Sequence, residues 1–159
     1  MGEQKRSNSQ LSAIQCSNNT NFILPIRVYY EDTDAGGVVY HSKYINFFER
    51  ARSELMRHIG YELDELAKKE KLLFVVRAIS CDYLLPAKFN DELFVSAVII
   101  AAGKTRIQFE QKVMKAGNAE DKNCITLAEG KVTVVSVDAE KFKPKRLPTK
   151  IIENIRGNL

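Results

Sequence analysis

The sequence predicts an α+β domain in which an antiparallel sheet of about five strands packs against one long helix. Apolar residues recur at helical spacing between Tyr44 and Ile59, which predicts the helix. One alternating segment before it and four apolar or alternating segments after it predict the strands. Because a helix and a sheet each have one apolar face to bury, we expect them to form two layers. A length of 159 residues fits one domain.

The N-terminal segment differs in composition from the rest of the chain. Residues 1–22 are rich in Ser, Asn and Gln, which predicts a disordered tail. The single domain is therefore expected to span residues 23–159. No internal repeat divides it.

The first strand is predicted around Ile26, Val28 and Tyr30, which recur at every second position. Gly36 and Gly37 then interrupt the extended pattern. We therefore expect an acidic turn between this strand and the long helix.

The long helix is predicted to run from Ser42, which can cap its start, to Gly60, which can adopt the left-handed conformation and end it. Its apolar stripe consists of Tyr44, Phe47, Phe48, Ala51, Leu55 and Ile59. Segment 62–71 has acidic residues early and lysines late, an order that suits the helix dipole. A second, shorter helix is expected there.

Further strands are predicted over residues 72–85, 91–102, 105–115 and 125–137, and a short final helix over 150–156. Short connections between consecutive strands favour antiparallel pairing. Since the helix covers only one face of the sheet, the other face needs a cover, and we expect a dimer.

Composition and charge exclude several function classes. A net charge of +4 is modest and fits a solvated surface. The basic segment 141–150 lacks the interleaved aromatic residues and the recognition motif of a nucleic-acid-binding protein. No apolar run approaches the roughly 18 residues of a membrane span, and the N-terminus lacks the apolar core of a secretory signal. We therefore expect no nucleic-acid partner, no transmembrane segment and a cytoplasmic protein.

The cysteines and histidines predict no metal site and no disulfide. Cys16, Cys81 and Cys124 lie far apart without a CxxC pair, which favours reduced, structural thiols. Cys81 falls on an apolar strand and is expected to pack rather than to react. His41 and His58 are the only histidines, which excludes a catalytic zinc held by three of them.

The acidic turn has the composition of a reaction site. Asp34 is ionised at neutral pH and precedes two glycines that permit close approach of a ligand. The first turn of the next helix presents free N–H groups, which can stabilise an oxyanion. Asp34 can therefore attack a carbonyl directly or activate a water, and the sequence leaves both routes open.

Each of these residues also has an ordinary structural interpretation. Taken alone, Asp34 is more often a turn residue, and Asp32 is kept as one. Tyr30 is more often a half-buried strand aromatic. His41 can cap the helix or orient a substrate.

One long motif carries a specific resemblance. It reads Tyr30-Glu31-Asp32-Thr33-Asp34-Ala35-Gly36-Gly37-Val38-Val39-Tyr40-His41, followed by Tyr44 and Phe47-Phe48-Glu49-Arg50-Ala51-Arg52. Downstream matches are Phe74-Val75-Val76-Arg77, Tyr83, Pro86-Ala87, Lys143-Pro144 and Leu147-Pro148. The chain resembles the hotdog-fold thioesterases of the 4-hydroxybenzoyl-CoA thioesterase superfamily, in the branch of Tol–Pal-associated acyl-CoA thioesterases (YbgC type). The resemblance extends from about residue 25 to about residue 155.

The resemblance implies a hotdog fold, a curved antiparallel sheet wrapped around one long helix, and hydrolysis of an acyl-CoA to free acid and CoA without metal or cofactor. It places Asp34 at the catalytic carboxylate position, with Tyr30 and His41 lining the active site. It further implies homodimers or homotetramers with active sites at subunit interfaces.

The CoA phosphates need basic partners, for which Arg77, Lys104 and Arg106 are candidates beside the alternative of plain surface solvation. The branch also implies contact with an acyl carrier protein or with phospholipid-synthesis proteins, and a cytoplasmic location that includes a peripheral position at the inner membrane.

Two other functions fit the same fold. One is a non-catalytic module that binds acyl-CoA or acyl carrier protein, against which an intact Asp34 argues. The other is an enoyl-CoA hydratase, whose Asp/His pair belongs to a motif that this sequence does not show.

Overall fold

The computed structural model describes Cys16, residues 22–117 and residues 123–157. The strands are β1 (Phe22–Arg27), β2 (Leu72–Tyr83), β3 (Glu92–Ala102), β4 (Arg106–Ala116) and β5 (Cys124–Asp138). The helices are α2 (His41–His58), α3 (Leu63–Lys69) and α4 (Thr149–Arg156), with a short 3-10 turn, η1 (Tyr30–Asp32). Apart from Cys16 and Phe22, the predicted tail lies outside the described residues, and its disorder stays a prediction.

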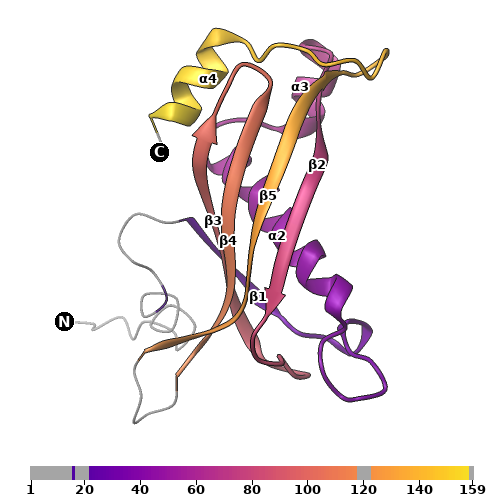
Figure 1. Ribbon diagram of the computed structural model, residues 1–159, viewed down its shortest axis with the longest axis vertical. Helices are drawn as coiled ribbons and strands as arrows, with labels where there is room; N and C mark the ends of the chain where they lie inside the picture. Colours follow the sequence, from indigo (N-terminus) through magenta and orange to yellow (C-terminus); the bar gives the residue numbers. More distant parts are fainter. Residues whose placement is uncertain (1–15, 17–21, 118–122, 158–159) are drawn as a thin grey trace, which may run out of the picture.

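All five strands form one antiparallel sheet in the order β1-β3-β4-β5-β2. α2 lies behind this sheet and crosses it (Figure 1). The predicted α+β architecture, a sheet packed on one long helix, is confirmed. β2 pairs with β5 rather than with β3, the next strand in sequence, so β2 is an edge of the sheet.

The apolar stripe of α2 forms the centre of the core. Phe47, Phe48 and Ala51 are fully buried, and Tyr44 and Leu55 are nearly so. They pack against the inward side chains of the strands, among them Leu93, Val95, Ile107, Val113 and Val132. The predicted stripe is confirmed from Tyr44 to Leu55, whereas its last member, Ile59, follows the end of α2 and is half-buried.

The two ends of α2 differ in how well they were predicted. Gly60 follows the helix with φ +97°, the left-handed conformation expected at this end. At the start, Tyr40 rather than Ser42 is the N-cap, and no side chain among the described residues caps it. Ser42 lies inside the first turn, so its predicted capping role is wrong.

The first strand ends earlier than predicted. β1 stops at Arg27, and Tyr30 lies in η1. The Asp32 carboxylate accepts the Tyr29 N–H at 2.9 Å, a local bond that draws the chain out of the extended conformation. The alternation of apolar residues does not reveal such a side chain-to-backbone hydrogen bond, so it could not predict where β1 ends.

The middle of the sheet face away from α2 is polar, whereas Phe94 and Met114 form a small apolar area at one end of this face. On it Lys112 lies 3.8 Å from Glu129, and Lys131 lies 3.9 Å from Glu110. Most of the exposed large apolar residues lie on β2 and in the connections that follow β1 and β2, and the others are Ile100 on β3, Ile125 on β5 and Phe142 after β5. The argument that a dimer covers this face is therefore weakened, and the predicted dimer has to be argued from another part of the surface.

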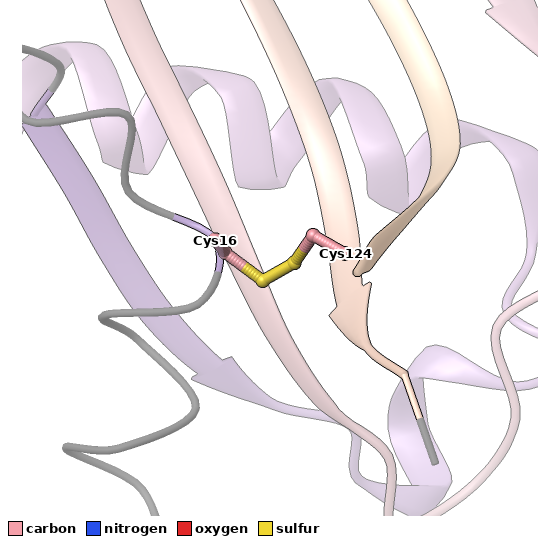
Figure 2. The surroundings of a disulfide bond; sticks show 2 residues. All are labelled: Cys16 and Cys124. Carbon is pink, nitrogen blue, oxygen red and sulfur yellow. A yellow bond between two sulfur atoms is a disulfide. The ribbon is translucent and has the colours of Figure 1, made fainter. Parts of the chain in front are cut away.

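The prediction of three reduced thiols is wrong for two of the cysteines. A disulfide joins Cys16 to Cys124 at the start of β5, with Cα atoms 5.2 Å apart (Figure 2). This separation is ordinary for a disulfide. Cys16 packs with Phe94 and Met114, in a small apolar cluster separate from the α2 core. Cys81 is the free cysteine of the described residues, and burial raises the pKa of its thiol.

Among the described helices, none has both the length and the apolar character needed to cross a bilayer.

Candidate active site

Asp34 lies at the tip of a tight turn between β1 and α2. Its backbone N–H donates to the Val38 carbonyl at 3.0 Å, and its carbonyl accepts the Gly37 N–H at 3.0 Å. Its Oδ1 accepts the Gly36 N–H at 2.7 Å, which leaves Oδ2 available to a ligand. The carboxylate is exposed to solvent in the single chain.

The two glycines have separate roles in this turn. Gly37 has φ +74°, which residues with a Cβ rarely adopt. A Cβ on Gly36 would lie 3.0 Å from Asp34 Oδ1 and would press on the carboxylate. The pair therefore shapes the turn around Asp34, and its predicted role in the close approach of a ligand stays a prediction.

The turn leads directly to the start of α2. The Tyr40 N–H donates to the Asp32 carbonyl at 2.8 Å, so the two sides of the turn meet at the N-cap of the helix. The first N–H groups of an α-helix have no intrahelical acceptor and carry partial positive charge. His41 is the first helical residue, and its side chain is exposed. This arrangement places a carboxylate and the free N–H groups of a helix start on one connection.

Aromatic side chains surround the helix start. The Tyr83 hydroxyl donates to the His41 carbonyl at 3.1 Å, and the Tyr83 ring lies 5.4 Å from that of Tyr44. The Tyr44 hydroxyl accepts the Ala87 N–H at 3.0 Å. Ala87 in turn accepts the Val39 N–H through its carbonyl at 2.8 Å. The connection after β2 is thereby attached to both the helix and the turn.

Tyr30 faces outward from this region. Its ring stacks on Phe89 with centroids 4.0 Å apart, and 77% of its surface is exposed. Tyr30, Asp34 and His41 therefore lie on one connection, between β1 and the first residue of α2. Tyr30 is exposed and lies in η1, so it is not the half-buried strand residue of the ordinary structural interpretation.

An apolar cavity of about 120 Å³ lies beside the middle of α2. Its lining residues are Glu49, Arg52, Ser53, Met56, Leu63, Phe74, Val76, Ile107, Phe109 and Val134. Glu49 lies eight residues after His41, roughly 12 Å along the helix axis. The cavity is thus within reach of a ligand held at the helix start.

Arg52, which lines the cavity, forms a buried polar pair with Gln111 of β4. Arg52 Nη1 donates to Gln111 Oε1 at 2.8 Å, and Gln111 Nε2 donates to the Phe48 carbonyl at 3.0 Å. Burial lowers the pKa of the Arg52 guanidinium, and the nearby Glu49 partly opposes that shift. Arg52 belongs to the quoted motif, but its burial and its partner on β4 have no sequence signal.

The three basic candidates do not meet Asp34 within one chain. The Val28 N–H donates to the Asp91 carbonyl, so the acidic turn lies at the beginning of β3. Lys104 and Arg106 lie at the hairpin after β3, roughly 33 Å away along the strand. Figure 1 shows this hairpin and the acidic turn at opposite ends of the sheet. Arg77 is exposed near the middle of β2.

Sequence reasoning missed Phe89 and the role of Tyr83 at this site. Both follow β2 or end it, far from the acidic turn in sequence. Only the antiparallel return of β2 and the Val38–Lys88 bridge bring them to the helix start. Among the described residues, no group of three or more His, Cys, Asp or Glu side chains is arranged to hold a metal ion.

Comparison with known proteins identifies relatives over almost the whole described chain. Residues 28–155 match the thioesterase-like superfamily. The acyl-CoA thioester hydrolase YbgC of Escherichia coli O6:H1 is 42% identical over 139 residues, covering 87% of this chain and 98% of the relative. The acyl-CoA thioesterase YbgC of Haemophilus influenzae is 40% identical over 133 residues, covering 84% and 93%.

A solved structure supports the same relationship. The crystal structure of a probable thioesterase from Bartonella henselae superimposes with a TM-score of 0.73 at 34% identity. The match covers 80% of this chain and 99% of the other.

Proposed function

Since this chain belongs to the thioesterase-like superfamily, we propose that it hydrolyses acyl-CoA thioesters to a free acid and CoA, with Asp34 as the reacting carboxylate. The relatives that are named acyl-CoA thioester hydrolases or thioesterases are about 40% identical to this chain over nearly their full length.

One observation supports the site above all. Asp34 lies at the tip of a turn whose base is hydrogen bonded to the N-cap of α2. We propose that the carbonyl oxygen of the thioester meets the first N–H groups of α2 while its carbon lies beside the Asp34 carboxylate. These donors stabilise the oxyanion more in the transition state than in the ground state, which is the condition for catalysis.

Two routes of equal stoichiometry follow. In one, Asp34 Oδ2 attacks the carbonyl carbon, the C–S bond breaks, CoA leaves as a thiolate and water hydrolyses the acyl-aspartate anhydride. In the other, Asp34 takes a proton from a water that attacks the carbon, and the same thiolate leaves. After a single turnover in ¹⁸O-water, label in the Asp34 carboxylate identifies the anhydride route in which water attacks the aspartyl carbon, whereas water attack on the acyl carbon puts the label in the free acid.

We further propose that the acyl group enters the cavity beside α2. Its lining is mostly apolar, and its volume of about 120 Å³ is close to that of an engineered cavity of about 150 Å³ that admits benzene. A short acyl group fits this size better than a long chain.

A homodimer paired through β2 is the assembly that we propose. β2 is a twelve-residue edge strand, and Val76, Ile79 and Tyr83 on it are 51%, 39% and 49% exposed. Long apolar edges are seldom left uncovered in native proteins. A second β2 related by a two-fold axis would cover this edge and place the Leu72 end of one chain beside the Tyr83 end of the other.

This pairing supports a role for the basic candidates. The end of the sheet that carries Lys104 and Arg106 in one chain would approach the acidic turn of the other, and Arg77 would lie close to the axis. We propose that these residues meet the CoA phosphates across the interface.

We also propose a cytoplasmic location with an acyl carrier protein as a further partner. Lys141, Lys143 and Arg146 are exposed cations near the C-terminus, and they suit an acidic protein or an anionic lipid surface.

The experiment that tests the function is a thiol-release assay over a panel of acyl-CoA chain lengths. Asp34→Asn removes the charge and keeps the shape of the side chain, so we expect kcat to fall about 10²–10⁴-fold. Asp34→Ala should behave in the same way, and circular dichroism should show both variants folded.

Glu31→Gln is the matched control, since Glu31 is an exposed acidic residue of the same turn. It should retain activity. Full hydrolysis by Asp34→Asn would contradict the assignment of Asp34, and no turnover of any acyl-CoA by the wild type would favour a binding module instead.

A further inference from the structure

Asp32 is a buried carboxylate in an otherwise exposed turn. Its surface is 2% exposed, whereas Asp34, two residues later, is open to solvent. Oδ2 of Asp32 accepts the Tyr29 N–H at 2.9 Å. Oδ1 is fully buried and accepts no hydrogen bond from the described residues.

The charge that faces Oδ1 comes from the first turn of α2. Lys43 Nζ lies 3.4 Å from Asp32 Oδ1, and the lysine side chain is 24% exposed. Burying a carboxylate without a partner costs free energy, and the positive charge of Lys43 offsets this cost for Asp32. A plain turn aspartate needs neither the burial nor the cation.

The ion pair reinforces a backbone connection between the same two segments. The Asp32 carbonyl accepts the Tyr40 N–H at 2.8 Å, and the Lys43 N–H donates to the Tyr40 carbonyl at 2.9 Å. Asp32 therefore holds one side of the turn and Lys43 the helix on the other. Asp34 and the first N–H groups of α2 lie on the two segments that this pair joins.

We propose that Asp32 and Lys43 are a positioning pair, which fixes the Asp34 carboxylate relative to the oxyanion-stabilising start of α2. The inference rests on the proposed function, in which these two groups act on one thioester. Neither residue touches the substrate. Misplacement of a reacting group by about 1 Å can cost about 10²-fold in rate, so a pair that restrains the turn affects chemistry more than binding.

The first test compares kinetics of Lys43→Met with those of the wild type. Lys43→Met keeps the apolar stem and removes the charge, so we expect kcat to fall about 10²-fold while KM for acyl-CoA stays near its wild-type value. Lys43→Arg keeps the charge and should restore most of kcat. Asp32→Asn should resemble Lys43→Met, and the double variant should lose no more than either single variant, because both break one interaction.

The matched control is Lys112→Met. Lys112 pairs with Glu129 on the sheet face away from α2, so the same substitution removes an ion pair that cannot reach the turn. It should leave kcat and KM unchanged.

A second measurement does not depend on activity. Hydrogen exchange of the segment 29–43 should accelerate in Lys43→Met, because the Tyr40 and Asp34 amides are protected by bonds within the turn. It should stay as in the wild type in Lys112→Met and in Asp34→Asn. If Asp32→Asn fails to fold, the kinetics and hydrogen exchange of Lys43→Met are sufficient to test the proposal.

Two results would overturn the proposal. One is wild-type exchange in Lys43→Met. The other is faster exchange with an unchanged kcat per folded molecule, which would make the pair structural only. An active Asp34→Asn variant would instead contradict the proposed function, while the exchange data would still report on the pair.

Discussion

Two aspartates two residues apart have opposite environments in this protein. Asp34 is solvent-exposed at the tip of a turn, and Asp32 is buried at its base. The difference comes from the chain around them: the Asp32 carboxylate meets an N–H and a lysine, whereas Asp34 meets Gly36 and solvent. From residue type alone, both aspartates are expected to be ordinary turn residues.

Another residue-scale device is the buried pair of Arg52 and Gln111. Gln111 is fully buried on β4, and it accepts from the guanidinium while donating to the Phe48 carbonyl. No ion pair among the described residues involves Arg52, so the amide oxygen is the acceptor that its buried charge meets. Hydrogen bonds to charged groups are stronger than neutral ones.

Gln111→Leu should therefore destabilise the fold. It leaves Arg52 without this acceptor, and we expect a loss of about 1.5–3 kcal/mol in the free energy of unfolding, measured by urea denaturation. Arg52→Met combined with Gln111→Leu should cost less than the sum of the single changes.

The control for this prediction is Gln108→Leu, the same change at a half-buried position of the same strand. A similar loss at both glutamines would contradict a specific role for the buried pair.

At the scale of elements, a glycine on β5 determines how closely α2 and β2 can approach that strand. A Cβ on Gly130 of β5 would lie 2.3 Å from the Ser80 carbonyl of β2 and 2.9 Å from the Phe48 ring. Neither neighbour can move freely, because Ser80 is in a paired strand and Phe48 is fully buried. The glycine thus permits close packing of two strands and the helix.

Gly130→Ala is expected to destabilise the domain by about 1–3 kcal/mol, since the new methyl group forces strand or helix to shift. Thermal or urea unfolding measures this loss. Gly103→Ala is the comparison, because a Cβ there would meet only the Arg106 carbonyl at an ordinary 3.7 Å. Equal stability of the two variants would refute the packing argument.

At the scale of the whole molecule, the edge strand β2 is the feature that the single chain leaves incomplete. Val76, Ile79 and Tyr83 on it are exposed, and the Tyr83 hydroxyl contacts the helix start. A partner along this edge would cover the apolar strand and border both the cavity and the acidic turn. Oligomerisation and activity are therefore coupled in the proposed assembly.

Ile79→Lys should break the proposed dimer, because a lysine on an edge strand disfavours pairing with a second strand. Light scattering should give twice the chain mass of 18.0 kDa for the wild type and the single mass for the variant. Ile125→Lys is matched to it, since Ile125 on β5 is 38% exposed and Ile79 is 39% exposed. It should remain dimeric. A monomeric wild type, or dimeric Ile79→Lys, would contradict pairing through β2.

Much of this architecture follows from local sequence alone. The stripe of α2, the left-handed Gly60, the short α3 and the spans of the later strands follow from periodicity and turn chemistry, which act over a few residues. The turn around Asp34 belongs to the same class, because its glycines determine its shape locally. The long motif then carried the family resemblance.

Contacts between distant segments were decided only by the tertiary structure. Pairing of β2 with β5, the union of Cys16 with Cys124, and the meeting of Arg52 with Gln111 join residues that no local pattern relates. The burial of Asp32 is of the same kind, since it depends on where α2 begins relative to the turn. Local propensities specify elements, whereas burial and pairing arise from how those elements pack, and this packing brings Tyr83 to the start of α2 and Lys43 to Asp32.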